Sequence, residues 1–264
     1  MGGLIARYFL MYGDADLPAD GSSPPVTWAG AALVDRAILI GTPNAGSVES
    51  FVELNRGAPF GAGLPKYEAA ILGTMPSIYQ LLPRPRHGAV VRADRPDQPA
   101  GDFFDAALWE SQGWGLADPA NDGVLKQLLP DVPAEADRRR VALDHLQKCL
   151  SRAKRFDAAI DTPAAPPAGL ELFLFAGDAV PTGSVAEAGR GGKSVRVVKT
   201  APGDGTVIRT SALMDERVGQ PWQPKLVSPV AWKQVWFLFT DHLGMTKDPQ
   251  FSDNVLYLLL EKPA

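Results

Sequence analysis

Short, almost continuously apolar runs constrain the fold of this chain more than any other feature of its sequence. They lie at residues 36–40, 170–175 and 233–240, and a further strand is expected at 194–198. Strands that are buried on both faces of a parallel sheet have this pattern, whereas half-exposed strands alternate between apolar and polar residues. The sequence therefore predicts strands of a parallel sheet, each followed by a turn or loop.

The segments between these strands carry helical patterns. Apolar residues three and four apart, with Pro and Gly breaks between the segments, predict helices at 2–12, 48–55, 65–73, 121–129, 134–160 and 249–261. Because residues 44–167 show no strand pattern, the order along the chain indicates an α/β fold with a mainly helical cap inserted between sheet strands. We expect residues 1–43 and 168–264 to form the sheet domain and residues 44–167 to form the cap.

The longest predicted helix, 134–160, combines an apolar stripe with many basic residues. These are Arg138, Arg139, Arg140, Lys148, Arg152, Lys154 and Arg155. A solvated basic face is one interpretation, and peripheral contact with anionic lipid head groups is the other. His145 and Cys149 lie one turn apart on this helix, and we interpret both as packing residues.

Composition excludes several classes of protein. With 26 Lys and Arg against 30 Asp and Glu, the net charge of −4 argues against a generally basic nucleic-acid binder. The single cysteine, Cys149, excludes internal disulfides and cysteine-rich zinc sites, and the three histidines are far apart in sequence. The longest apolar run, 255–260, is much shorter than the ~18 residues of a membrane span. The sequence therefore predicts no metal, and it gives no localisation.

Two residues that can carry chemistry follow the later strands. Asp204 lies in a Gly-Asp-Gly turn, and His242 comes directly after the run 233–240. Reactive side chains of α/β sheets gather at the carboxyl ends of the strands. A carboxylate that orients a histidine makes it a general base for a serine hydroxyl, and acid before histidine is the chain order of α/β-hydrolases. Asp178, after the strand 170–175, is the competing acid, and Asp241 is expected to be solvent-facing or structural.

Five segments, in order and spanning nearly the whole chain, carry a family resemblance. They are Met-Gly-Gly-Leu-Ile-Ala-Arg-Tyr-Phe-Leu at 1–10, Ile-Gly-Thr-Pro-Asn-Ala-Gly-Ser at 40–47, Met-Pro-Ser-Ile-Tyr-Gln-Leu-Leu-Pro at 75–83, Gly-Asp-Gly-Thr-Val at 203–207 and Asp-His-Leu-Gly-Met at 241–245. Together they resemble the lecithin:cholesterol acyltransferase family, which includes lysosomal phospholipase A2 and phospholipid:diacylglycerol acyltransferases. The resemblance implies a partial α/β-hydrolase fold with a cap, and a Ser-Asp-His triad in which Asp204 is the acid and His242 the base.

The resemblance also implies where the nucleophile belongs. In the family the nucleophilic serine directly precedes Met-Gly-Gly, so the serine is expected just before Met1, whose backbone N–H is then an oxyanion-hole donor. Gly2 and Gly3, which cost roughly 1 kcal/mol each in a helix, are then the small residues of the sharp turn at the nucleophile. Ser47 and the other serines lack this context. We therefore expect the first half of the family's sheet to be missing from this sequence, which would leave the strand 36–40 with an unpaired, aggregation-prone edge.

The expected function follows from this resemblance. In its complete form the protein would be a serine-dependent lipid O-acyltransferase or a phospholipase/esterase, acting on a lipid or other acyl ester without a cofactor, and the chain as it stands would be inactive. The alternatives are a non-catalytic lipid-binding or regulatory chain and an inactive fragment. Trp109 and Trp114 would line an acyl groove or pack in the core, and Tyr79 is expected to be structural. The disulfide-closed lid of the animal members cannot form with one cysteine.

Overall fold

The computed structural model describes residues 1–59, 61 and 63–261. Contacts divide the chain into two compact units. Unit 1 comprises Met1–Ala45, Ala159–Gly183 and Thr200–Ala264, and unit 2 comprises Gly46–Ala158 and Ser184–Lys199. Unit 2 thus includes residues 184–199, which lie outside the range expected for the cap. Residues 60, 62 and 262–264 belong to the predicted domain ranges but lie outside the described residues.

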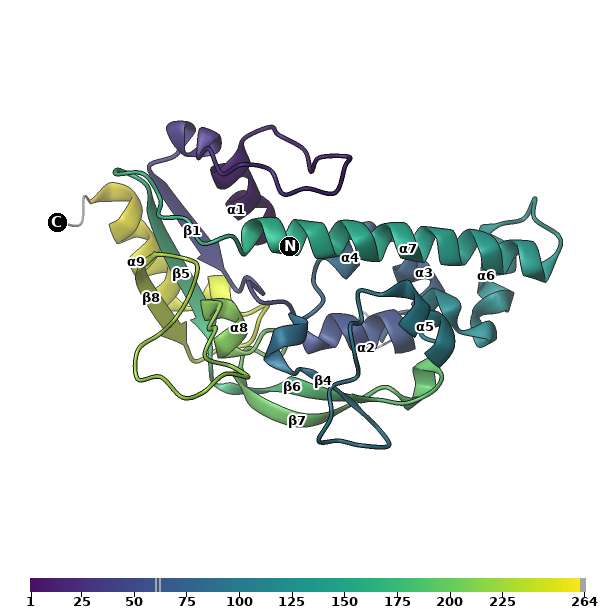
Figure 1. The fold of residues 1–264 in the computed structure, drawn as a ribbon. Helices are drawn as coiled ribbons and strands as arrows, with labels where there is room; N and C mark the ends of the chain where they lie inside the picture. Colours follow the sequence, from purple (N-terminus) through teal and green to yellow (C-terminus); the bar gives the residue numbers. More distant parts are fainter. Residues whose placement is uncertain (60, 62, 262–264) are drawn as a thin grey trace. The chain divides into compact units, whose positions relative to one another are not determined.

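Unit 1 contains a three-stranded parallel sheet. Its strands β1 (Arg36–Ile40), β5 (Glu171–Gly177) and β8 (Trp232–Leu238) lie side by side in the order β1-β5-β8 (Figure 1). Ile38 is opposite Phe173 in one ladder, and Leu174 is opposite Val235 in the other. The three apolar runs predicted as parallel strands are therefore confirmed, and the chain has an α/β fold.

Helices cover both faces of this sheet, which explains why β5 is apolar at nearly every position. Leu174 packs on one face with Ala212 of α8 (Arg209–Leu213), while Leu172 clusters with Leu10 of α1 (Gly2–Tyr12). Phe173 and Phe175 face the other side, where Leu258 of α9 (Pro249–Leu260) is buried against them. Two short 3-10 helices complete the unit, η1 (Ala29–Leu33) and η6 (Met245–Lys247). Alternate side chains are thus buried on opposite faces.

Strand β1 lies at the edge of this sheet. Among the described strands it pairs only with β5, and the side chain of Ile40 is partly exposed. Arg36, at its start, donates hydrogen bonds to the backbone carbonyl groups of Leu258 and Glu261 at the end of α9. Cations are favourable at a helix C-terminus, so this contact stabilises the end of α9. The edge position agrees with the sequence analysis, and aggregation through it stays a prediction.

Unit 2 is built mainly from helices. Its α-helices are α2 (Val48–Arg56), α3 (Ala69–Gly73), α4 (Pro76–Tyr79), α5 (Ala106–Gln112), α6 (Asp122–Leu128) and α7 (Glu135–Ile160), the last of which ends in unit 1. The 3-10 helices are η2 (Pro85–His87), η3 (Gly115–Ala117), η4 (Pro119–Asn121) and η5 (Gly192–Ser194). The short strands β2 (Ala58–Pro59) and β3 (Lys66–Tyr67) pair antiparallel.

A second sheet contains two strands, β6 and β7, whose residues are divided between the two units. It has the order β4-β6-β7, with β4 (Val90–Arg92), β6 (Val180–Ala188) and β7 (Arg196–Gly203). Within unit 2, β4 runs parallel to β6, with Val90 opposite Ala186. The sequence analysis missed β4 and β6 and placed the start of β7 two residues early. It also assigned one helix to 65–73, where the structure has β3 followed by α3, because residues 66–67 pair with β2.

Aromatic side chains fill the core of unit 2. Phe51 contacts the rings of Trp109 and Trp114 edge-on, at centroid distances of 5.7 and 5.4 Å, and Tyr79 lies against Trp109. All four side chains are buried, and Leu146 of α7 belongs to the same cluster. Trp109 and Trp114 are therefore core residues, and Tyr79 is structural as expected. Burial raises the pKa of the Tyr79 phenol far above its ordinary value.

The basic residues of α7 are largely paired with acidic residues of the same unit. Arg138 is buried and forms a bidentate pair with Asp122, so it is not part of a solvated face. Four further pairs are Arg139–Glu110, Arg140–Asp137, Lys148–Asp144 and Lys154–Asp102. Contact of this helix with anionic lipid stays a prediction.

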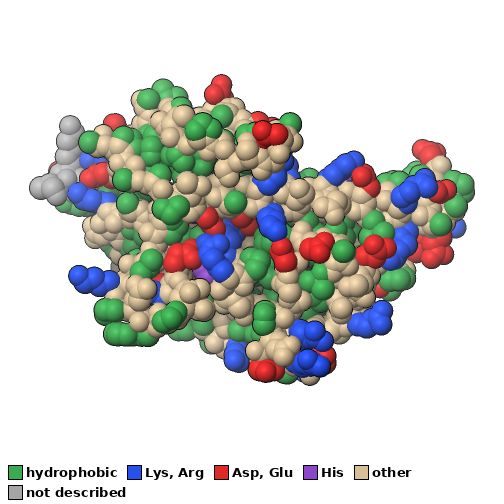
Figure 2. Space-filling view, viewed as in Figure 1, with side chains coloured by type: hydrophobic (Ala, Val, Ile, Leu, Met, Phe, Trp, Pro, Cys, Tyr) green, Lys and Arg blue, Asp and Glu red, His purple; other side chains and the backbone are tan. Residues whose placement is uncertain are grey.

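The described residues include no helix that is long and apolar enough to cross a membrane. On the face shown in Figure 2, Lys and Arg side chains are interspersed with Asp and Glu, as expected from the nearly balanced composition.

Candidate functional site

Asp204 and His242 meet in unit 1. The Oδ2 atom of Asp204 lies 2.8 Å from Nδ1 of His242, and the backbone N–H of His242 donates to the carbonyl oxygen of Asp204 at 2.8 Å. The two residues are 38 positions apart in the chain. The carboxylate is buried, whereas the side chain of His242 is 34% exposed. The structure therefore brings together the two residues that the sequence analysis proposed as acid and base.

Asp204 and His242 both lie in loops that follow strands. His242 lies four residues beyond the end of β8, and Asp204 directly follows β7. Oδ1 of Asp204 accepts hydrogen bonds from the backbone N–H groups of Thr206 and Val207, at 2.9 and 2.7 Å. This is an Asx turn, in which an aspartate side chain accepts hydrogen bonds from backbone N–H groups that follow it in the chain. It holds one carboxylate oxygen and leaves the other aimed at the imidazole.

The hydrogen bonds determine which nitrogen of His242 is available for chemistry. An ionised carboxylate can only accept, so the 2.8 Å contact with Asp204 requires the proton on Nδ1. In the neutral imidazole Nε2 is then the acceptor. Within the described part of the chain, Nε2 of His242 has no hydrogen-bond partner. The pair thus leaves Nε2 as an unpaired acceptor on a side chain that is partly exposed.

Two glycines make room for the pair. A Cβ at Gly41, which has φ +55°, would lie 3.0 Å from Cε1 and 3.1 Å from Nδ1 of His242. A Cβ at Gly177 would lie 2.7 Å from Cβ of Asp204. Gly41 directly follows β1 and Gly177 ends β5. The backbone at the carboxyl end of each strand therefore lies so close to the pair that a side chain there would collide with it. The sequence analysis did not single out either glycine as part of the site.

Helix α1 begins beside this loop. The side chain of Thr42 occupies the space in which a Cβ at position 3 would lie, and Thr42 is the next residue after Gly41. Gly3 therefore permits the close approach of the first turn of α1 to the end of β1. Met1, half-buried at the start of α1, accepts hydrogen bonds at its carbonyl oxygen from the N–H groups of Leu4 and Ile5, and burial lowers the pKa of its amino group. Its role as an oxyanion donor stays a prediction.

The competing acid has a different partner. Oδ2 of Asp178 lies 3.4 Å from the guanidinium of Arg209, which in turn lies over the ring of Phe237. Asp241 accepts from the backbone N–H of Gly244 at 2.6 Å, a loop contact in agreement with its expected structural role. The geometry thus favours Asp204 over Asp178 as the partner of the histidine.

The other residues singled out from the sequence have local roles. Ser47 is the N-cap of α2, where its Oγ accepts from the N–H of Glu49 at 3.2 Å. Sγ of Cys149 lies 3.3 Å from Nε2 of His145 on the same helix, and burial raises the pKa of the thiol. A raised pKa opposes thiolate formation, so this pair is not poised for nucleophilic chemistry.

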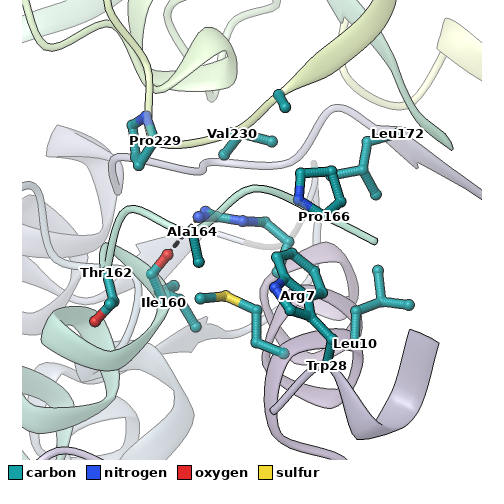
Figure 3. Close-up of a pocket in the computed structure, with 12 residues that line it drawn as sticks. Arg7, Leu10, Trp28, Ile160, Thr162, Ala164, Pro166, Leu172, Pro229 and Val230 are labelled. Atoms are coloured by element: carbon teal, nitrogen blue, oxygen red, sulfur yellow. Dashed lines mark hydrogen bonds between the residues drawn. The ribbon is translucent and has the colours of Figure 1, made fainter. Parts of the chain in front are cut away.

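A small cavity beside α1 is lined by Arg7, which the sequence analysis did not identify. Arg7 is buried and donates to Oδ1 of Asn44 at 3.2 Å. It also donates to the carbonyl oxygen of Ile160 at 2.5 Å, the contact drawn as a dashed line in Figure 3. The cavity, also lined by Trp28 and Leu172, holds about 20 Å³, which is room for about one water molecule. The cavity is too small for an acyl chain. Through its hydrogen bond to Ile160, Arg7 connects α1 with the end of α7.

Known proteins supply no identification. No family model matches the chain, and a search of curated proteins finds no matching sequence. Among the described residues, no group of three or more His, Cys, Asp or Glu side chains is arranged to hold a metal ion. The site in unit 1 is therefore defined by its geometry, a buried carboxylate and a partly exposed imidazole in an α/β fold.

Proposed function

We propose that Asp204 and His242 are the acid and the general base of an acyl-transfer site of the serine-hydrolase type. The observation that carries this proposal is the 2.8 Å contact between the buried carboxylate and Nδ1 of a histidine whose side chain is partly exposed, which leaves Nε2 without a hydrogen-bond partner among the described residues. A general base must lie within hydrogen-bond reach of the proton that it removes, and its ring must be held in one tautomer. The Asp204 contact provides the second of these conditions.

The proposed chemistry has two steps. Nε2 of His242 takes the proton of a serine hydroxyl while the serine oxygen bonds to the ester carbonyl carbon; the proton then passes to the leaving alcohol and an acyl-serine remains. Water or an acceptor alcohol next gives its proton to Nε2 and bonds to the acyl carbon. The bond between the acyl carbon and the serine oxygen then breaks, and the proton on Nε2 passes to that oxygen and restores the serine hydroxyl. Asp204 stabilises the imidazolium in both steps. The serine has to be supplied at Nε2, and in the complete form we assign it to the position before Met1.

The proposed substrates are lipid or other acyl esters, as in the lecithin:cholesterol acyltransferase family. The five segments quoted above support this family, and so do two exposed apolar residues close to His242 in the chain. Phe239 and Leu243, which flank His242 in the chain, are 85% and 82% exposed. Large apolar side chains at this degree of exposure favour an apolar ligand next to the base.

A second candidate function is supported by the same surface. The open position at Nε2, together with exposed Phe239 and Leu243, also fits a chain that binds lipid without transferring its acyl group. Hydrolysis of a short-chain p-nitrophenyl ester separates the two. For the chain as given we expect no turnover that depends on His242, and substantial turnover abolished in His242→Ala would show that the nucleophile lies within these 264 residues.

The position of the nucleophile has a direct test. The DNA immediately upstream of the Met1 codon is translated in frame. A frame that reads Gly-x-Ser before Met1, after an apolar strand, is the expected result, and the extended protein should hydrolyse the ester. In it, Asp204→Asn should cripple turnover and Asp178→Asn should not. An in-frame stop would overturn the catalytic proposal and favour the lipid-binding function.

A further inference from the structure

A second, much larger cavity lies entirely within unit 2. Its volume is about 400 Å³, which falls within the ~300–1,000 Å³ of small-molecule sites. Its apolar side chains are Ala93, Ala100, Leu108, Trp114 and Ala188, so three of these five are single methyl groups. Small side chains thus make up much of the apolar wall beside Leu108 and Trp114.

The walls of this cavity are fixed by backbone hydrogen bonds. Ala93 donates to the carbonyl oxygen of Ala188 at 3.0 Å, which ties the end of β4 to the end of β6. Nε1 of Trp114 donates to the carbonyl oxygen of Gly189 at 2.7 Å, and the N–H of Gly191 donates to the carbonyl oxygen of Gln112 at 2.7 Å. The indole and the end of α5 are therefore held against the segment that follows β6, and the cavity is preformed.

The two arginines that line this cavity differ in whether an acidic side chain pairs with them. Arg92 is neutralised by a bidentate pair with Asp94, at 2.9 and 2.7 Å, and this pair lowers the pKa of the Asp94 carboxyl. Among the described residues, Arg190 makes one hydrogen bond, a long one of 3.4 Å to the carbonyl oxygen of Ser111. Across the described residues, no acidic side chain pairs with Arg190, and the side-chain amide of Gln112 has no hydrogen-bond partner. The lining thus offers one uncompensated guanidinium and one free amide.

We propose that this cavity binds a small organic monoanion, a carboxylate with a short apolar body. The carboxylate would accept hydrogen bonds from the guanidinium of Arg190, which suits planar carboxylates, and from the amide of Gln112. The apolar body would lie against Leu108 and Trp114. Asp94 at the rim disfavours a doubly charged phosphate, because the lining carries a net charge of only one. This binding site is independent of the Asp204–His242 pair.

Binding of hexanoate to the full chain tests the proposal, with hexanamide as the neutral analogue of the same shape. Titrations are followed by ¹⁵N-resolved NMR at the backbone amides of Gly189 and Gly191. We expect saturable shifts with hexanoate at these positions, and at least tenfold weaker binding of hexanamide. Equal binding of the two compounds, or no saturable shift with hexanoate, would overturn the proposal.

Two variants separate a specific contact from general electrostatic attraction. Arg190→Gln should weaken hexanoate binding at least tenfold. Lys193→Gln removes the same charge three residues away, at a side chain that does not line the cavity, and should leave binding within twofold. Both residues are outside the core, so the two variants should fold alike. Equal loss in both variants would show that the anion is attracted only by net charge, and the assignment to Arg190 would be wrong.

Discussion

Replacement of Gly41 by alanine tests whether the end of β1 positions the Asp204–His242 pair. Gly88 provides the matched control, because it has φ +64° against +55° at Gly41, and a Cβ at Gly88 would meet nothing within 4 Å. Alanine in this left-handed conformation costs about 1–2 kcal/mol at either position. Gly88→Ala should therefore lower the free energy of unfolding by that amount and change nothing at the site.

Gly41→Ala adds a steric cost that the control lacks. Its methyl carbon would lie 3.0 Å from Cε1 and 3.1 Å from Nδ1 of His242, whereas carbon contacts are comfortable at about 3.5–4.0 Å. A shift of the ring by about 0.5 Å would take the 2.8 Å contact with Asp204 beyond the usual N–H···O distance of ~3.2 Å. Loss of a hydrogen bond to a charged group costs about 1.5–3 kcal/mol, and the lower value applies to a ring that is one-third exposed.

The assay combines urea unfolding with proton NMR. We expect Gly41→Ala to lose about 1.5 kcal/mol more than Gly88→Ala, and to lose the low-field signal of a histidine Nδ1 proton bonded to a carboxylate. Gly88→Ala should keep that signal. If Gly41→Ala is no less stable than Gly88→Ala and retains the low-field proton, the turn after β1 does not position the histidine, and the reasoning is refuted.

Three further results are expected. Asp204→Asn should abolish the low-field proton of His242 and lower the free energy of unfolding by about 1–3 kcal/mol, since one buried acceptor is lost; an unchanged signal in the NMR spectrum would contradict the pairing. Arg84→Met should cost about 3–5 kcal/mol in urea unfolding, because the buried charge of Asp157 loses the guanidinium 2.7 Å away; a loss below about 1 kcal/mol would mean that Asp157 is stabilised by other groups. Native Cys149 should react slowly with iodoacetamide at pH 8 and rapidly after unfolding. Burial holds the pKa of the Cys149 thiol higher in the folded protein than in the unfolded chain. The stability gained from keeping this thiol protonated is therefore complete below the ordinary thiol pKa of about 8.5, and it is lost as pH rises through the folded pKa. Rapid labelling of the folded protein would contradict the raised pKa.

Sequence alone was sufficient for the elements whose apolar pattern is strong. The runs at 36–40 and 170–175 predict β1 and β5 because both strands are rich in apolar residues, and β5 is buried on both faces. The periodicity at 134–160 predicts α7 to within a residue. The sequence also limited the partner of His242 to two acids that follow strands, Asp178 and Asp204, and the resemblance at 203–207 favoured Asp204. These patterns lie within short segments and can be recognised without knowing which residues pack against them.

The tertiary structure decided what depends on partners far away in the chain. β6 contains Pro181 and Gly183 and has little strand pattern, and it forms because residues 186–188 pair with β4. Asp178 and Asp204 both follow strands, and only their position in space gives one to Arg209 and the other to His242. The cavity beside Arg190 was likewise not readable, because its walls come from segments nearly 100 residues apart. A sequence records which side chains can interact, while packing selects which of them meet.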